Sequence, residues 1–421
     1  MPCARYSYKR IYTVRWLLFT TPFFNGPHKN FLYYLRTMNI GFDAKRAFHN
    51  GTGLGHYSRT LINGLAAFFP EHEYYLFNPK PGSHYHPDTR NIHEIQPSGF
   101  FSKMFRNAWR SSGVKADLLK HNIKLYHGLS HEIPLGIQKT GIRSVVTMHD
   151  LIFERYPDQY NQVDVQIYRK KFRNAVNHAD KVIAISRQTR DDLVNLYHTP
   201  NEKIEVCYQS CNPAFSVRVD SDEKKRVRQQ YGLPERFFLY VGSIIKRKNL
   251  LTICKAMNML KETNRLPLVV IGSGGSYKQS VKEYLKVEGL ENRVIFLSES
   301  HEARHSRTFR NAEDFPAIYQ SATAMIYPSF FEGFGIPVLE ALWSRIPVIT
   351  SNVSCLPETG GDAAYYVNPE SESELAIAMQ RVAQDEALRL SMIEKGWAHA
   401  HAFTNEKCAA SVMMVYNQLI G

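Results

Sequence analysis

One segment of nine residues, Glu332-Gly-Phe-Gly-Ile-Pro-Val-Leu-Glu340, constrains the fold of this chain more than any other. The apolar run 322–328 precedes it, and Ala341-Leu-Trp follows it. This pattern predicts a strand, a tight glycine turn and a helix that begins near Ile336. Pro337 suits the first turn of such a helix, because proline lacks an N–H that would have no partner there. The segment therefore favours an α/β fold.

The same segment predicts a binding site. Glycines 333 and 335 allow the backbone to approach a ligand closely, and the helix start offers free N–H groups to a phosphate. Glu332 and Glu340 flank this turn, and carboxylates accept hydrogen bonds from sugar hydroxyls. The segment could hold a sugar, a diphosphate and a ribose together. The alternative is that both acids lie on the surface at a helix start, where negative charge is mildly favoured.

Short apolar runs alternate with helical periods from Met38 onward. The first half has candidate strands at 38–43, 74–78, 124–127, 143–148, 181–185 and 204–208. After a break near the charged stretch 220–226, further candidate strands lie at 237–241, 268–271, 294–297, 325–327, 348–350 and 365–367. This alternation predicts parallel sheets joined by crossover helices. Two Rossmann-like domains of this kind bind ligands in a cleft between the carboxyl ends of their strands.

The chain divides into four predicted regions: a leader (1–37), an N-terminal domain (38–215), a C-terminal domain (216–398) and a final helix (399–421) that crosses back to the first domain. The leader holds six basic residues, no acid and many aromatic residues, and its apolar run is too short to span a bilayer. We interpret it as an upstream translation artefact from a true start at Met38, or as a disordered arm. The alternative is a peripheral anchor on an anionic membrane.

Composition excludes several classes of protein. Six scattered cysteines without zinc spacing indicate reduced thiols and a cytoplasmic protein. The net charge of +13 comes without a basic stripe or an aromatic platform, so nucleic-acid binding is not predicted. Asp220-Ser-Asp222 has no strand before it and is interpreted as solvated charge. No metal site is predicted.

Two glycine turns of the second half lie at predicted strand ends. Gly242 begins the first, and Arg247 and Lys248 follow in the same loop, where fixed positive charge could stabilise a leaving diphosphate without a metal. The alternative for this pair is a solvated basic turn. Gly272 begins the second turn, which by itself is a weak signal. Residues 351–358 are expected to support the glutamate segment.

The first half contributes two further candidates. Gly53-Leu54-Gly55 follows the first strand and opens a helix, but its spacing differs from the dinucleotide-binding fingerprint. His149 and Asp150 end another predicted strand at the cleft, where His149 could bind a sugar hydroxyl or the acceptor. Ser186 is expected to cap the helix that follows it.

The glutamate segment resembles the Glu-x7-Glu motif of retaining GT-B glycosyltransferases. The complete sequence of the segment is similar to that of family 4 (glycosyl transferases group 1). His149-Asp150-Leu and Arg247-Lys248-Asn249 resemble bacterial surface-polysaccharide mannosyltransferases. The resemblance covers residues 38–421 and implies catalytic roles for His149, Glu332, Arg247 and Lys248. Gly53, Leu54, Gly55 and Asp150 would face the acceptor and the phosphates. The implied donor-binding residues are Gly242, Arg247, Lys248, Gly272, Gly333, Phe334, Gly335, Ile336, Val338 and Glu340.

The resemblance implies a GT-B fold and a metal-independent, retaining hexosyltransferase. It would move mannose from a nucleotide sugar such as GDP-mannose to a saccharide or lipid-linked acceptor, in the biosynthesis of a polysaccharide such as lipopolysaccharide. No other cofactor is implied. Members often carry an arginine directly after the first glycine, where this chain has Ser243. Two alternatives stay open: a GT-B-shaped nucleotide-sugar 2-epimerase and a non-catalytic nucleotide-sugar binding subunit.

Overall fold

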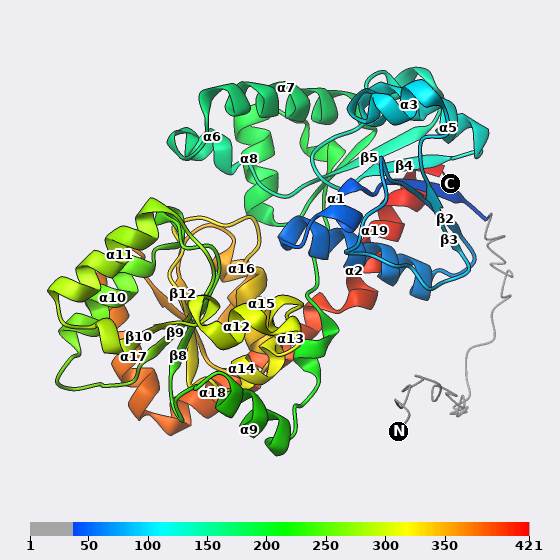
Figure 1. The fold of residues 1–421 in the computed structure, drawn as a ribbon. Helices are drawn as coiled ribbons and strands as arrows, with labels where there is room; N and C mark the ends of the chain where they lie inside the picture. Colours follow the sequence, from blue (N-terminus) through cyan, green and yellow to red (C-terminus); the bar gives the residue numbers. More distant parts are fainter. Residues whose placement is uncertain (1–36, 421) are drawn as a thin grey trace, which may run out of the picture. The chain divides into compact units, whose positions relative to one another are not determined.

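The computed structural model describes residues 37–420, which belong to one compact unit (Figure 1). The leader, with both interpretations of it, lies outside the described residues. The unit contains two sheets in which every pair of neighbouring strands is parallel. The predicted α/β class is therefore confirmed.

The first sheet has seven strands in the order β3-β2-β1-β4-β5-β6-β7. The strands are β1 (Asn39–Asp43), β2 (Glu73–Phe77), β3 (Ile92–Ile95), β4 (Leu125–Gly128), β5 (Arg143–Met148), β6 (Lys181–Ala184) and β7 (Ile204–Val206). Among these strands, only β3 was not predicted from the sequence. This strand lies at the sheet edge, and its four residues Ile-His-Glu-Ile are only partly buried, so it lacks the apolar run of a central strand.

The second sheet has six strands in the order β10-β9-β8-β11-β12-β13. The strands are β8 (Phe238–Val241), β9 (Leu268–Ile271), β10 (Val294–Phe296), β11 (Ala324–Tyr327), β12 (Val348–Ser351) and β13 (Tyr365–Val367). The strand order reverses between β8 and β11 here and between β1 and β4 in the first sheet. Ligands of open α/β sheets bind at such reversals, beyond the carboxyl ends of the strands.

Helices cover both faces of the first sheet: α5 and α7 lie on one face, and α2 and α19 on the other (Figure 1). The apolar face of α2 (Tyr57, Leu61, Ile62 and Leu65) is buried, whereas Phe68 at the end of the helix is 45% exposed. Ser186 accepts a hydrogen bond from the Thr189 N–H and caps α8, as predicted. The helices of this half are α1 (Lys45–His49), α2 (Gly53–Phe68), α3 (Phe100–Met104), α4 (Arg106–Ala108), α5 (Val114–Lys120), α6 (Ile152–Arg155), α7 (Gln162–His178) and α8 (Arg187–Tyr197).

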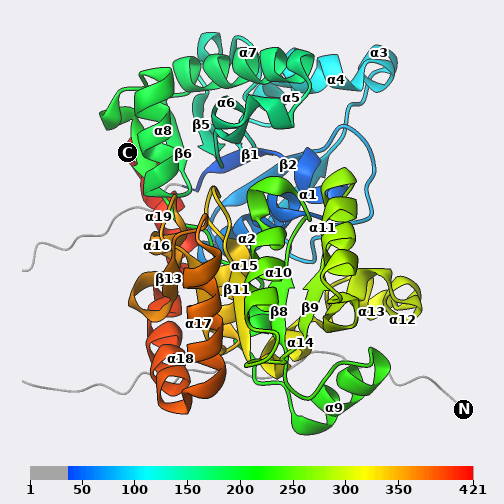
Figure 2. The same cartoon turned by 90° about the vertical axis from the view of Figure 1, so that its left-hand side faces the viewer.

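The chain ends in helices that pack on different sheets. Helix α18 packs against α15 beside the second sheet, whereas α19 packs against α2 beside the first (Figure 2). His127 and the Tyr416 hydroxyl form a buried hydrogen bond of 2.6 Å there. The later helices are α9 (Ser221–Gln230), α10 (Leu250–Met259), α11 (Ser276–Val287), α12 (His301–His305), α13 (Arg307–Arg310), α14 (Phe315–Ser321), α15 (Ile336–Trp343), α16 (Leu356–Gly360), α17 (Glu372–Gln384), α18 (Glu386–Ala400) and α19 (Asn405–Ile420).

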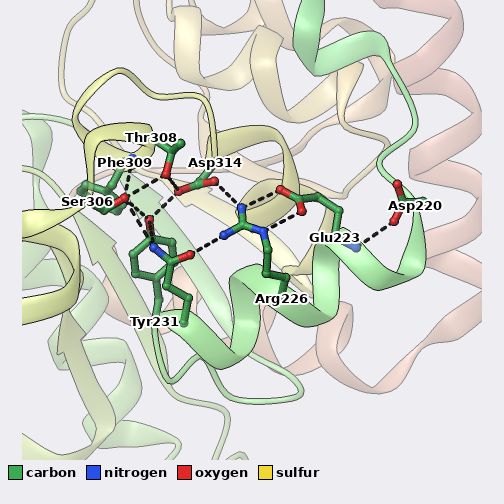
Figure 3. A network of polar contacts seen from close by, with 9 residues as sticks. Asp220, Glu223, Arg226, Tyr231, Ser306, Thr308, Phe309 and Asp314 are labelled. Carbon is green, nitrogen blue, oxygen red and sulfur yellow. Dashed lines mark hydrogen bonds and ion pairs between the residues drawn. The ribbon is translucent and has the colours of Figure 1, made fainter. Parts of the chain in front are cut away.

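The acidic stretch between the two halves forms the start of α9. Asp220 accepts a hydrogen bond of 2.7 Å from the Glu223 N–H and so caps this helix, which makes Asp220 more than the solvated charge that we expected. Arg226 then pairs with Glu223 at 2.6 Å and with Asp314 at 2.8 Å (Figure 3).

No helix within residues 37–420 has the length and apolar character needed to cross a membrane.

Candidate functional site

The carboxylate of Glu332 is the centre of a buried polar cluster. Its Oε1 atom accepts hydrogen bonds from the Ser329 hydroxyl at 2.7 Å and the Tyr327 hydroxyl at 3.0 Å. The same atom lies 3.0 Å from Arg247 Nη1 and 3.3 Å from Lys248 Nζ. These groups come from the carboxyl end of β11 and from the loop after β8. The two strands at the sheet's reversal point therefore bring the predicted acid and the basic pair together.

Two cations keep Glu332 ionised. Burial alone would raise the pKa of this carboxyl, but Lys248, Arg247 and the two hydroxyl donors outweigh burial and lower the pKa below its usual value. Arg247 is only 7% exposed, and its guanidinium also donates to the Phe331 carbonyl. Its buried Nε has no hydrogen-bond partner among the described residues. A buried donor without a partner is costly, so this nitrogen is a candidate ligand for an anion.

The two glycines of the turn have different structural roles. A Cβ atom on Gly333 would lie 2.2 Å from the carbonyl oxygen of His149, so glycine is required there for contact with the first half of the chain. Gly335 has a φ of +96°, in the left-handed region that favours glycine. We expected both glycines to admit a ligand. At Gly333 the close neighbour is instead the His149 backbone.

Helix α15 begins at Ile336, as predicted, and leaves fewer free N–H groups than we expected. We expected the backbone around Gly335, Ile336 and Val338 to bind the nucleotide-sugar donor. Val338 donates its N–H to the Gly335 carbonyl at 2.9 Å, and Pro337 has none to donate. The N–H groups of Phe334, Gly335 and Ile336 have no partner in the described part of the chain. The available donors therefore lie in the turn and at the first residue of the helix.

His149 is a neutral, firmly held group. Its Nε2 donates to the Leu129 carbonyl at 2.9 Å, and its backbone N–H donates to His131 Nε2 at 2.9 Å. Its ring meets the edge of Tyr57 at a centroid distance of 4.6 Å. Burial lowers the pKa of His149 to about 4, so the imidazole is neutral at neutral pH. Only Nδ1 remains to accept a hydrogen bond from a ligand.

Asp150 brings a second carboxylate near the basic pair. Its carboxyl group is enclosed although the residue keeps some accessible surface, and burial raises its pKa. Arg247 opposes this rise electrostatically, whereas Glu332 adds to it. Nearby, Arg155 lies over the Phe331 ring at 5.1 Å. The segment after β5 and the turn after β11 therefore meet, which unites predicted residues from both halves in one site.

The remaining predicted glycines lie at strand and helix ends. Gly53 and Leu54 begin α2, and Gly55 donates its N–H to the Thr52 carbonyl at 2.9 Å. Tyr57, one turn further on, connects this loop to His149. A Cβ on Gly53 would meet nothing within 4 Å, so the first turn of α2 stays open.

The two glycine turns of the second half are joined to neighbouring strands. Gly242 donates its N–H to the Ile271 carbonyl at 2.9 Å. Gly272 donates to the Ser298 hydroxyl at 2.9 Å. Lys248 extends back toward Gly242, because a Cβ there would lie 3.4 Å from Lys248 Nζ. These contacts place the turn after β8 beside the glutamate cluster. The turn after β9 lies beside the turn after β8.

Glu340, the second acid of the motif, lies in a different environment. Its Oε2 accepts a hydrogen bond of 2.8 Å from the Tyr319 hydroxyl of α14. The residue is not completely inaccessible, yet its carboxyl group is enclosed, and burial raises its pKa to about 7. The Tyr319 hydrogen bond and the charge of Lys248 oppose this rise. Glu340 therefore changes charge near neutral pH.

The segment after β12 holds the glutamate turn in place, as predicted. Ser354 Oγ accepts from the Glu332 N–H at 3.2 Å and donates to the Glu332 carbonyl at 2.8 Å. Cys355 donates to that same carbonyl, and Thr359 donates to the carbonyl of Phe334. Tyr327 and Ser329 were missed as partners of Glu332. Their spacing before the acid was the available signal, because a strand end brings such side chains together.

Residues 37–420 contain no group of three or more His, Cys, Asp or Glu side chains arranged to hold a metal ion.

Comparisons with known proteins show which proteins this chain is similar to. Residues 51–215 match the model "Glycosyltransferase Family 4", and residues 221–398 match "Glycosyl transferases group 1". O-antigen chain mannosyltransferase B of Escherichia coli is 25% identical over 87% of this chain and 96% of the relative. O-antigen chain mannosyltransferase RfbU of Salmonella typhimurium is 28% identical over 62% of this chain and 66% of the relative. Anabaena Alr3699/HepE, solved with UDP-glucose, superposes with a TM-score of 0.67 at 16% identity, over 90% of this chain and all of that one.

Proposed function

Since each half of the chain matches a glycosyltransferase model, this chain belongs to the GT-B glycosyltransferases, and we propose that it transfers mannose from a nucleotide sugar. The acceptor is a saccharide or a lipid-linked saccharide, and the product belongs to a surface polysaccharide. The observation that carries the proposal is the cluster around Glu332, in which an ionised acid lies beside Arg247 and Lys248 and the buried Nε of Arg247 has no partner among residues 37–420.

The diphosphate of the donor binds at this cluster. Arg247 Nε and the N–H groups of Phe334, Gly335 and Ile336 are its hydrogen-bond donors. Lys248 supplies a second positive charge. Donors at a helix start and fixed cations both favour an anion, and they favour it more as charge develops on a leaving group. The proposed site therefore stabilises departure of the nucleoside diphosphate without a metal.

The transfer step is proposed to retain the configuration of the sugar. The bond between the anomeric carbon and the diphosphate oxygen breaks, and the oxygen leaves with the electron pair. The acceptor hydroxyl attacks the resulting oxocarbenium-like carbon on the same face and passes its proton to the departing phosphate oxygen. Glu332 binds hydroxyls of the sugar, and His149 Nδ1 accepts a hydrogen bond from the sugar or the acceptor. Glu340 binds the ribose.

Mannose and GDP are proposed because the two curated relatives above are mannosyltransferases of O-antigen chains. The Anabaena structure contains UDP-glucose, which makes UDP-glucose the main competing donor. The enzyme is proposed to act in the cytoplasm, with peripheral contact at the inner face of the membrane when its acceptor is lipid-linked.

A donor panel tests the proposal. Purified protein is mixed with GDP-mannose, UDP-glucose, UDP-galactose or GDP alone, and the thermal midpoint is measured. A bound ligand raises this midpoint by mass action. GDP-mannose and GDP should raise it, and GDP-mannose should be consumed only when acceptor is present. Conversion of donor to its epimer without acceptor would replace the transferase proposal by an epimerase. Selective binding of UDP-glucose would refute mannose.

A further inference from the structure

A cavity in the first half lies apart from the proposed donor site. Its volume is about 280 Å³, close to the lower end of the range of about 300–1,000 Å³ that small-molecule pockets occupy. The cavity is lined by residues of α7 and of the π-helical turn Trp109–Gly113, by the last residue of β1 and by residues of β4 and the loop after it. The order of the first sheet reverses between β1 and β4, where open α/β sheets bind ligands. His149 and the glutamate turn do not line it.

The charged groups of the cavity neutralise one another. Arg110 donates to both carboxylate oxygens of Asp43 and also to Glu132 at 2.8 Å. Glu132 binds Lys171 at 3.0 Å through its other oxygen. Asp43 is only 2% exposed, so its charge depends on this pairing. The remaining cation of the lining, Lys170, is exposed to solvent. The floor therefore offers no unpaired buried charge to a phosphate or a carboxylate.

Three neutral polar groups face the cavity without an internal partner. Tyr126 is 2% exposed, and its hydroxyl forms no hydrogen bond with the described residues. The side chains of Ser111 and Asn174 likewise have no hydrogen-bond partner within residues 37–420. A polar group at the surface of a cavity that has no protein partner is free to bind water or a ligand. These groups can donate to and accept from hydroxyls of a neutral ligand.

The walls of the cavity are apolar. Ile133 is buried in them, and Leu135 and Ile167 are 52% and 45% exposed. A pyranose has an apolar face of C–H groups and a rim of hydroxyls, so it matches apolar walls over a neutral polar floor. We propose that the cavity binds an uncharged sugar residue of the acceptor. This inference rests on the proposed function, because it names the acceptor as a saccharide longer than one unit.

The ring of His131 connects this cavity to the transfer site. Glu132 follows His131 in the chain, and the His131 ring stacks on Phe172 of α7 at 4.4 Å. On another side, the His131 ring meets the His149 ring at 5.1 Å. A sugar in the cavity is thus held beside the reacting position and not in it. It is a remote unit of the acceptor, which anchors the chain while another unit reacts.

Substitution of Tyr126→Phe tests the inference with little structural change. It deletes one oxygen that has no internal partner, so the thermal midpoint should stay the same. Asn174→Leu tests a second group, on α7. Tyr75→Phe is the matched control, because Tyr75 lies on β2 of the same sheet, its hydroxyl has no partner in the described region, and it does not line the cavity.

Binding is measured by saturation-transfer NMR without donor, using neutral mannose, glucose and galactose oligosaccharides, with inorganic phosphate added as a competitor. One oligosaccharide series should bind, and Tyr126→Phe and Asn174→Leu should each weaken that binding about fivefold, the loss of one neutral hydrogen bond. Tyr75→Phe should bind normally. Equal binding by all variants, binding of no oligosaccharide, or displacement of the oligosaccharide by phosphate overturns the inference. Failure of the proposed function is recognised separately, by the absence of a thermal shift with GDP-mannose.

Discussion

At the scale of single residues, the two glutamates of the motif have opposite electrostatic surroundings. Glu332 contacts Arg247 and Lys248, which hold its pKa below the usual value. Glu340 has one neutral hydrogen-bond donor, Tyr319, and burial raises its pKa to about 7. Glu332 is therefore ionised throughout the neutral range. Glu340 is the group whose charge changes with pH, and two predictions follow from it.

Glu340→Gln should stabilise the protein at pH 8 and have little effect at pH 5. The folded pKa of Glu340 lies above its unfolded value, so the folded state binds the proton more tightly. Stability is therefore lost as pH rises from about 4.5 toward 7, and glutamine, which cannot ionise, avoids this loss. Thermal midpoints at both pH values provide the measurement. Glu370→Gln, an exposed acid in the same half, is the control, and equal shifts for both variants would contradict the prediction.

Glu340→Ala should weaken donor binding by about 1.5–3 kcal/mol, because ribose hydroxyls would lose a charged acceptor. Donor affinity of the native protein should rise from pH 6 to pH 8 as the carboxyl ionises near 7. Glu340→Ala should lose this pH dependence. Isothermal calorimetry with GDP-mannose measures both effects, and an unchanged affinity would remove Glu340 from the site.

Lys248→Met should lower kcat about 10²–10³-fold and change the donor KM less, because charge on the leaving diphosphate grows toward the transition state. Arg247→Ala should act in the same direction. It would also cost stability, since Arg247 is buried against Glu332. Lys246→Met, an exposed lysine of the same loop, is the matched control. Steady-state kinetics with a chelator present should give the same result, whereas rescue by manganese would indicate a metal site.

At the scale of elements, the start of α8 is capped from the other half of the chain. The Glu358 carboxylate accepts from the Arg187 N–H at 2.8 Å and from the Gln188 N–H at 3.0 Å. Tyr208 donates to the same carboxylate at 3.2 Å. An acid at a helix N-terminus satisfies free N–H groups and the helix dipole. Glu358 belongs to α16, in the segment after β12 that holds the glutamate turn in place. This cap therefore also joins that segment to the first half of the chain.

Glu358→Ala should destabilise the protein by about 0.5–2 kcal/mol, the usual cost of a lost cap. It should also increase amide exchange at Arg187 and Gln188. Ser371→Ala removes the cap of α17 within the second half, so it should cost similar stability without changing exchange in α8. Chemical denaturation and hydrogen-exchange mass spectrometry measure the two effects. Protection of Arg187 and Gln188 that is equal in both variants would contradict the prediction.

At the scale of the whole molecule, the described core begins with the first strand. Met38 is 4% exposed and β1 is buried against β2 and β4, so the sheet needs no residue before Met38 for its central strands. The leader carries six basic residues, and a basic residue held near an anionic bilayer contributes about 1 kcal/mol to binding.

Deletion of residues 2–37 should therefore leave a folded and active enzyme on soluble acceptor. Sedimentation with vesicles of phosphatidylserine and phosphatidylcholine then distinguishes the two interpretations of the leader. If both forms behave alike, the leader is dispensable. If only the full chain pellets, the leader is an anchor. A truncated form that is misfolded would contradict the prediction.

The sequence alone determined the features that depend on local pattern. Apolar runs located every strand except β3, since central parallel strands are buried on both faces and edge strands are not. The glycine turn and Pro337 located the start of α15 at Ile336. Residue type and position at predicted strand ends also indicated that four residues belong to one candidate site: His149, Arg247, Lys248 and Glu332.

Only the tertiary structure decided how these groups are used, because their partners come from distant parts of the chain. Gly333 is a glycine because the His149 carbonyl lies against it, a contact between residues 184 positions apart. The opposite pKa shifts of Glu332 and Glu340 depend on which cations and hydroxyls surround each carboxyl group. The cavity beside Tyr126 has no sequence motif, since its floor, walls and charge pairs assemble from β1, β4 and α7 only when the chain folds.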